Sequence, residues 1–254
     1  MNQAMDRART GANDAVRSGL DHLHDFRDDL HEKVADLKPK LRGWLHLGVA
    51  PLTLAAGIVL VALSPTTASR IGSAVFTGSA LVLFSVSAIY HTGTWSPRTW
   101  AFLRRFDHAN IFLLIAGSYT PFSLLLLEGT QRVALLTTVW TGAVLGVLFR
   151  VFWTDAPRWL YVPIYIAMGW AAVFFIPAFL DGATAIGGVG MGIAIFTMIV
   201  VGGALYTFGG VVYGFKRPNP WPRWFGFHEV FHTFTILAFV SHYVGVSMAT
   251  YALR

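Results

Sequence analysis

The chain has 254 residues, of which 55% are hydrophobic and 13% are charged, and it contains no cysteine. This composition lies far from that of soluble domains and favours a membrane protein. Without cysteine the chain has no disulfide bond and no thiolate metal site, so a transition metal must bind to histidine, aspartate, glutamate or water. The net charge is +6. Beyond residue 42 the basic residues lie in short connectors between apolar runs, a pattern typical of membrane orientation rather than of nucleic-acid binding.

The first 42 residues differ from the rest of the chain. They carry eight Lys/Arg and eight Asp/Glu, with apolar residues at roughly helical spacing. This pattern predicts an amphipathic helix in water, and it lacks the apolar core of a signal peptide. We therefore expect a charged cytoplasmic N-terminal segment at residues 1–42 and a transmembrane domain at residues 43–254.

Seven apolar stretches follow, each near the ~20 residues that a helix needs to cross a bilayer. They predict an all-α, polytopic membrane protein with a bundle of seven transmembrane helices. The stretches lie at residues 44–64, 71–92, 106–127, 132–152, 159–180, 190–213 and 226–250.

Basic residues predict the orientation of this bundle. A cytoplasmic N-terminus places sixteen of the 19 Lys/Arg on the inner side, as expected when basic loops stay in the cytoplasm. Only Arg70, Arg132 and Arg254 fall outside. We therefore expect a multi-pass protein of the bacterial cell membrane with its N-terminus inside and its C-terminus outside.

Polar residues gather at the cytoplasmic ends of the second, third and seventh predicted spans. Ionisable groups inside a membrane span are costly and usually functional. Two of the pairs are four residues apart, which places both members on one face of a helix. The residues are Ser87 and His91, Asp107 and His108, and His228 and His232.

Three of these histidines form a candidate metal site. Neutral imidazole suits zinc, and three histidines leave the fourth position of a tetrahedral ion open, as in catalytic sites. We predict that His91, His228 and His232 bind the metal. Asp107 is placed to orient or deprotonate a water molecule, and Ser87 to hydrogen-bond a substrate oxygen or an oxyanion.

Other interpretations of these polar residues stay open. Asp107 is also suited to cap the third span or to pair with Arg104. We expect His108 to be structural, because it faces a different side of its helix from Asp107. His242 lies fourteen residues beyond His228, about 21 Å deeper at the helical rise, so it should not reach the site.

Three motifs, in order, resemble the hemolysin III family, the bacterial branch of the progestin and adipoQ receptor superfamily. They are Ser-Ala-Ile-Tyr-His at residues 87–91, the segment from Arg104 to Pro121, and His-Glu-Val-Phe-His at residues 228–232. The resemblance covers about residues 44–250. It implies seven helices with the N-terminus inside, zinc on the histidines at 91, 228 and 232, and Ser87 and Asp107 beside the metal.

The resemblance also implies kinship with alkaline ceramidases. The leading expectation is therefore a zinc-dependent hydrolase of a lipid-like amide or ester. A lipid-responsive receptor or regulator with structural zinc is the alternative, and the family name adds a third, a hemolysin or cytolysin. The expected partners are membrane lipids and a lipid-like substrate or ligand, with no nucleic acid. The oligomeric state is not predicted.

The last motif also matches the H-E-x-x-H helix of metalloproteases, in which the Glu is the general base. The Asp that would complete an intramembrane protease, Asp181, precedes the motif here and is predicted on the opposite membrane face. A protease is therefore not favoured. Glu229 points about 100° away from His228 on a helix, so we expect it to act from beside the ligands. His46, at the start of the first span, is assigned no role.

Overall fold

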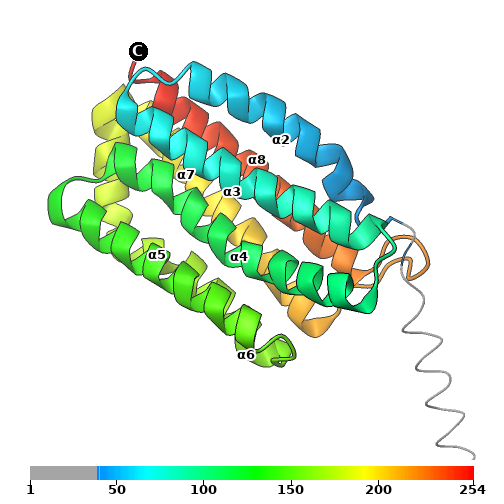
Figure 1. Ribbon diagram of the computed structural model, residues 1–254. Coiled ribbons are helices and arrows are strands. Elements are labelled where there is room, and N and C mark those ends of the chain that lie inside the picture. The colour runs from blue at the N-terminus through cyan, green and yellow to red at the C-terminus, as the bar shows by residue number, and fades with distance from the viewer. Residues whose placement is uncertain (1–38, 40) are drawn as a thin grey trace, which may run out of the picture. The chain divides into compact units, whose positions relative to one another are not determined.

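The computed structural model describes residue 39 and residues 41–254. All but the last residues of the charged segment predicted at 1–42 lie outside the described residues. In the described part, helices make up the regular structure, apart from one isolated bridge between Trp221 and Phe225, which confirms the all-α prediction there. Figure 1 shows the helices as a bundle. They are α2 (Trp44–Ala62), α3 (Thr67–Thr92), α4 (Pro97–Leu126), α5 (Gly129–Phe152), α6 (Arg158–Gly169), the short 3₁₀ helix η1 (Ala171–Phe175), α7 (Ile176–Phe215) and α8 (Phe227–Tyr251).

Six helical stretches among the described residues are long and apolar enough to cross a membrane. A helix suits that setting because it pairs its own backbone N–H and C=O groups. Five of the stretches are the single helices α2, α3, α4, α5 and α8. The sixth runs from Arg158 to Phe215, a length of 58 residues, and joins α6, η1 and α7. It contains both the fifth and the sixth of the seven predicted spans. Counting helical stretches by length and hydropathy therefore gives six among the described residues, where the sequence predicted seven.

The long stretch is interrupted at Gly188, where φ is 79° and ψ is 174°. Residues that carry a side chain rarely adopt this backbone conformation, whereas glycine adopts it at no steric cost. The two arms beside Gly188 lie against each other, because a Cβ atom added to Gly192 would be 2.8 Å from the Thr184 Cα atom. Figure 1 shows the yellow part of the chain turning near the end where the C-terminus lies and running back along the bundle as α7. The chain therefore reverses direction inside this stretch.

Helix α8 occupies a central position in the bundle, in contact with α2, α3, α4 and α7. Its neighbours bury aromatic side chains around it: Phe76 and Phe84 of α3 both pack against Phe239 of α8, with ring centroids 5.2 and 5.4 Å apart. This packing continues to the first turns of α8. Glu229, His232 and Thr235 are consequently buried there.

Helix α4 begins at Pro97, before the span predicted from residue 106. Ser96 caps its N-terminus, since its hydroxyl accepts a hydrogen bond from the Thr99 N–H group at 3.3 Å, and proline is favoured in the first helical turn. Hydropathy marks only the apolar part of this helix and misses its polar start. As a result, Asp107 lies inside α4 and is buried, so it does not cap the helix.

Candidate metal centre

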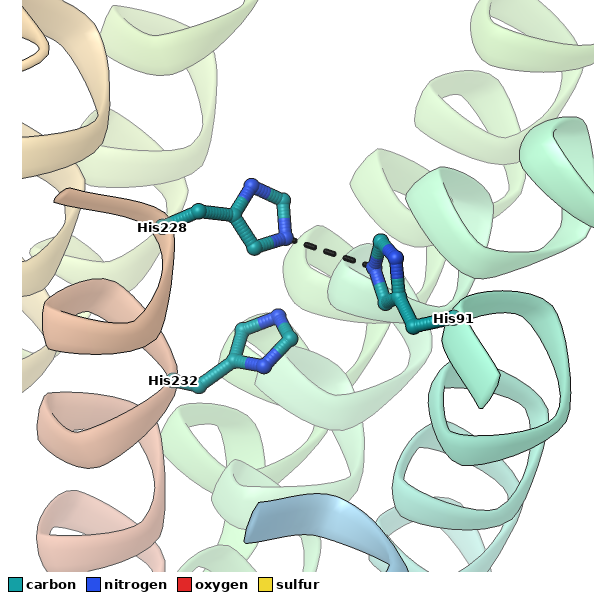
Figure 2. Close-up of side chains that lie close together, drawn as sticks. All are labelled: His91, His228 and His232. Atoms are coloured by element: carbon teal, nitrogen blue, oxygen red, sulfur yellow. Dashed lines mark hydrogen bonds between the residues drawn. The ribbon is translucent and has the colours of Figure 1, made fainter. Parts of the chain in front are cut away.

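The structure brings His91, His228 and His232 together. Each offers one ring nitrogen, and these nitrogens all lie within 4.8 Å of one another. His228 Nε2 is 3.3 Å from His91 Nε2. Figure 2 shows the three rings pointing into the same space, His91 from α3 and the other two from α8. The group could hold a metal ion.

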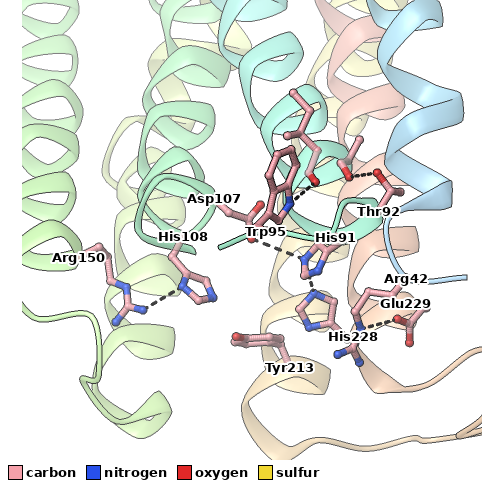
Figure 3. Close-up of polar contacts among 12 residues, drawn as sticks. Arg42, His91, Thr92, Trp95, Asp107, His108, Arg150, Tyr213, His228 and Glu229 are labelled. Atoms are coloured by element: carbon pink, nitrogen blue, oxygen red, sulfur yellow. Dashed lines mark hydrogen bonds and ion pairs between the residues drawn. The ribbon is translucent and has the colours of Figure 1, made fainter. Parts of the chain in front are cut away.

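The start of α8 positions two of these histidines. Their four-residue spacing puts both on the helix face that contacts α3. Glu229 holds the first turn, because its Oε2 atom accepts a hydrogen bond from the Gly226 N–H group at 2.8 Å. Its Oε1 atom accepts one from Arg42 Nε at 3.0 Å, and its side chain is fully buried. Figure 3 shows this pair beside His228. Glu229 thus connects the N-terminal end of the described bundle to the helix that carries the histidines.

Asp107 of α4 lies next to His91, with Oδ2 3.7 Å from His91 Nε2. The alternative partner, Arg104, pairs instead with Asp155 at 3.1 Å. Ser87 is buried one turn before His91 on the same face of α3, and its side chain interacts with the Asp107 carboxylate. Asp107 and Ser87, the two residues predicted to be catalytic, therefore lie on the α3–α4 side of the three histidines.

Sequence reasoning assigned no role to His46, yet this residue packs against the three clustered histidines. Its ring stacks on that of His232, with centroids 3.9 Å apart and planes 15° from parallel. The side chain is buried, and neither ring nitrogen has a hydrogen-bond partner among the described residues. The depth of His46 in the membrane could have indicated this position in the sequence. His46 lies near the inner end of the first predicted span, in the same layer as the other histidines. The structure places a fourth imidazole beside the three that cluster.

His108 has a different partner from its neighbour Asp107, in agreement with the expectation that the two face different sides. The Arg150 guanidinium donates a hydrogen bond to His108 Nδ1 at 3.2 Å and another to the Thr154 carbonyl at 3.0 Å. Arg150 is buried and also lies over the ring of Tyr161 at 4.4 Å from its centroid. Figure 3 shows the second ring nitrogen of His108 directed away from Arg150, toward the side where Tyr213 lies.

A cavity of about 390 Å³ adjoins the histidines. This volume lies in the range of small-molecule binding sites. Apolar side chains from α3, α4, α6, η1, α7 and α8 line most of it, and Ser87, Asp107 and His228 line one part. His242 does not belong to the metal-binding group, as expected from its depth, but it lines the same cavity. The polar residues around the histidines and the apolar side chains inside the bundle therefore line one cavity.

Comparison with known proteins identifies the family. The family model for Haemolysin-III related proteins matches residues 35–243. Two relatives are the Hemolysin-3 homolog of Bacillus subtilis (strain 168) and Hemolysin-3 of Bacillus cereus. The first is 31% identical over 162 residues, which are 64% of this chain and 69% of the relative. The second is 28% identical over 171 residues, or 67% of this chain and 71% of the relative.

The match to the family model covers most of the chain and includes every residue of the histidine cluster. Together with the six apolar helical stretches, it indicates a multi-pass protein that contacts membrane lipids, in bacteria those of the cell membrane. The chain belongs to the hemolysin III family of membrane proteins, within the progestin and adipoQ receptor superfamily.

Proposed function

We propose that this protein is a zinc-dependent membrane hydrolase that cleaves an amide or ester bond in a lipid-like substrate. The observation that carries the proposal is the junction between three clustered imidazoles and an apolar cavity. The imidazoles are of a kind that binds zinc, and the cavity is of a kind that holds an acyl chain. Each part of the proposal rests on a separate feature of the described residues.

The donor atoms fit zinc in type and spacing. Zinc binds imidazole nitrogen at ~2.0 to 2.1 Å in tetrahedral geometry, which separates two ligand atoms by about 3.3 Å. His91 Nε2 and His228 Nε2 are 3.3 Å apart. His232 completes the group, whose ligand atoms all lie within 4.8 Å of one another. Three histidine ligands leave one position for water or substrate.

The roles of the other residues follow from where they lie. Zinc, when bound, supplies Lewis-acid polarisation of a carbonyl group and activation of water near neutral pH. Asp107 lies close enough to the histidines to accept a proton from that water. The Ser87 hydroxyl bonds to the Asp107 carboxylate, and once Asp107 has accepted a proton the hydroxyl would be free to donate to the substrate oxygen. Glu229 acts from beside the ligands by holding the first turn of α8.

The substrate class follows from the cavity. Its lining is mostly apolar, and it lies among helices that are long and apolar enough to cross the membrane, which suits a lipid chain. Hydrolysis adds the elements of water across the amide or ester bond and releases a fatty acid and an amine or alcohol. A fatty acyl group bound with its carbonyl carbon at the histidines and its chain in the cavity fits this space.

We infer that the bundle crosses the membrane seven times. A straight helix of 58 residues would be about 87 Å long, far more than the ~30 Å hydrocarbon core. The reversal at Gly188 divides the stretch into two passes, which adds one to the six stretches counted by length. The distribution of Lys and Arg supports an N-terminus in the cytoplasm and a C-terminus outside. In that orientation the histidine cluster lies in the inner half of the membrane.

Turnover separates this proposal from a receptor or regulator that uses zinc structurally. The experiment incubates purified protein with a ceramide or a phospholipid in mixed micelles and measures released fatty acid. The hydrolase proposal predicts release by the wild type and loss of release in Asp107→Asn. Zinc-loaded wild-type protein that binds lipid without turnover would support the receptor. Lysis of red cells by protein freed of detergent would favour the cytolysin that the relatives' names suggest.

A further inference from the structure

The end of the cavity remote from the three histidines is also polar. Tyr206 of α7 and His242 of α8 both line the cavity there. His242 lies ten residues beyond His232 on the same helix, about 15 Å further along the helix axis. Polar side chains this far into a membrane bundle are costly and usually mark a function. We call these two residues the distal polar site.

Both residues offer a buried hydrogen-bonding atom. His242 Nδ1 is buried and has no hydrogen-bond partner among the described residues, and the buried Tyr206 hydroxyl makes no close hydrogen bond there, although the Ser118 side chain lies beside it. The two rings are neighbours, with centroids 5.6 Å apart. His242 is 8% exposed and fixed in place, since its ring packs edge-on against Phe122 at 5.8 Å. The distal polar site therefore pairs two polar groups that make no close hydrogen bond at these atoms and line one cavity.

The hydrogen-bonding character of each atom can be assigned. His242 Nε2 lies 3.3 Å from the Ile199 carbonyl oxygen, which only accepts hydrogen bonds. Nε2 therefore carries the ring hydrogen, and Nδ1 of the neutral imidazole is an acceptor. The Tyr206 hydroxyl can donate as well as accept. The site consequently offers an acceptor on His242 that has no partner among the described residues and a donor on Tyr206 that has only Ser118 beside it.

An alcohol is the group that complements this pair. Its hydrogen can bond to His242 Nδ1 while its oxygen accepts from the Tyr206 hydroxyl. A keto oxygen could accept from Tyr206 but would leave Nδ1 unpaired, and a methylene would leave both unpaired. A ligand that leaves a buried polar group without a partner binds more weakly. Such a site therefore discriminates between a lipid chain with a hydroxyl, one with a keto group and one with only methylenes at this position.

We propose that the distal polar site binds a hydroxyl group on the remote part of a lipid chain whose amide or ester lies at the histidine cluster. This inference rests on the proposed function, because it requires a lipid chain in the cavity. It narrows the substrate class from any acyl lipid to lipids that carry a hydroxyl far from the bond to be cleaved. A buried water molecule would satisfy the same atoms without any such selectivity.

Binding rather than turnover tests the proposal. The full-length protein in detergent is titrated with stearic acid, with a positional series of monohydroxylated stearic acids, and with the matching keto acids. We expect one region of hydroxyl positions to bind about five- to tenfold more tightly than stearic acid, the effect of one or two buried hydrogen bonds. The keto acid at the same position should lose most of this gain.

Two variants assign the effect to the site. Tyr206→Phe removes a single oxygen atom, and His242→Leu removes the acceptor. Each should abolish the preference for the hydroxylated acid while the variant still binds stearic acid, and this retained binding shows that the variant is folded. Tyr243→Phe is the matched control, because Tyr243 is on α8 outside the cavity and donates to the Ala56 carbonyl. It should keep the preference.

The outcomes separate the two proposals. Equal binding of all the acids by the wild type, or a preference that survives both variants, overturns the hydroxyl site and leaves a lipid-filled cavity standing. Failure of the wild type to bind any of the acids overturns both proposals together. A positional preference that disappears in Tyr206→Phe and persists in Tyr243→Phe supports the distal polar site.

Discussion

His46 of α2 lies flat against His232 of α8, with their ring centroids 3.9 Å apart. The contact restricts the plane of one clustered histidine. Residues that orient metal ligands typically change metal affinity by 10- to 100-fold when removed. The stack thus gives α2, which contributes no ligand of its own, a part in the candidate metal centre.

The first prediction concerns this stack. His46→Ala should lower zinc affinity about tenfold, because His232 then loses the ring that fixes its orientation. His46→Phe should keep most of the affinity, since it preserves a flat ring at the same place. Competition with a chelator of known affinity measures both. Equal affinities in wild type and His46→Ala would show that the stack does not organise the ligands.

The second prediction separates metal binding from chemistry. Asp107→Asn should retain zinc and lower the rate of lipid hydrolysis by about 100-fold or more, because an amide cannot accept the proton from water. The matched control is Asp155→Asn, which removes the exposed partner of Arg104 and should leave the rate unchanged. Loss of zinc from Asp107→Asn would instead make this carboxylate a ligand.

The third prediction concerns Arg42 and Glu229. Arg42→Ala leaves the fully buried Glu229 carboxylate without its charged partner and should destabilise the protein by about 1 to 3 kcal/mol. Adding Glu229→Gln to this variant removes the unpaired charge and should restore part of the loss. Thermal unfolding in detergent measures the difference. A double variant less stable than Arg42→Ala would contradict this explanation.

The fourth prediction tests the reversal in the 58-residue stretch. Gly188→Ala forces a side chain into a backbone conformation with φ of 79° and should lower stability by about 1 to 2 kcal/mol. Gly190→Ala is the control, because it has ordinary backbone geometry and no atom within 4 Å of the added Cβ. Similar unfolding temperatures for the two variants would argue against a required glycine at the turn.

Local patterns in the sequence predicted much of the site. The spacing of His228 and His232 requires one helix face, and the apolar runs place His91 and Asp107 at the same depth. Helical geometry and membrane depth together are enough to predict that these groups meet. The structure brings the three histidines together as this argument expected.

Contacts between distant segments were beyond such reasoning. The stack of His46 on His232 depends on how α2 packs against α8, which no periodicity reveals. Likewise, Glu229 was placed beside the ligands by its angle on the helix, but its pairing with Arg42 joins residues 187 positions apart. The start of α4 was missed because its first turns are polar, and hydropathy detects only the apolar part of a helix.

Zinc content is the most direct test of the central claim that imidazoles of α3 and α8 hold one ion. The protein is purified without added chelator, and its metals are quantified by mass spectrometry alongside the His228→Ala/His232→Ala double variant. We predict about one zinc per wild-type chain, the number that a single three-histidine site holds, and near-complete loss in the double variant. Less than half an equivalent in the wild type, or full retention of zinc in the double variant, would contradict the account.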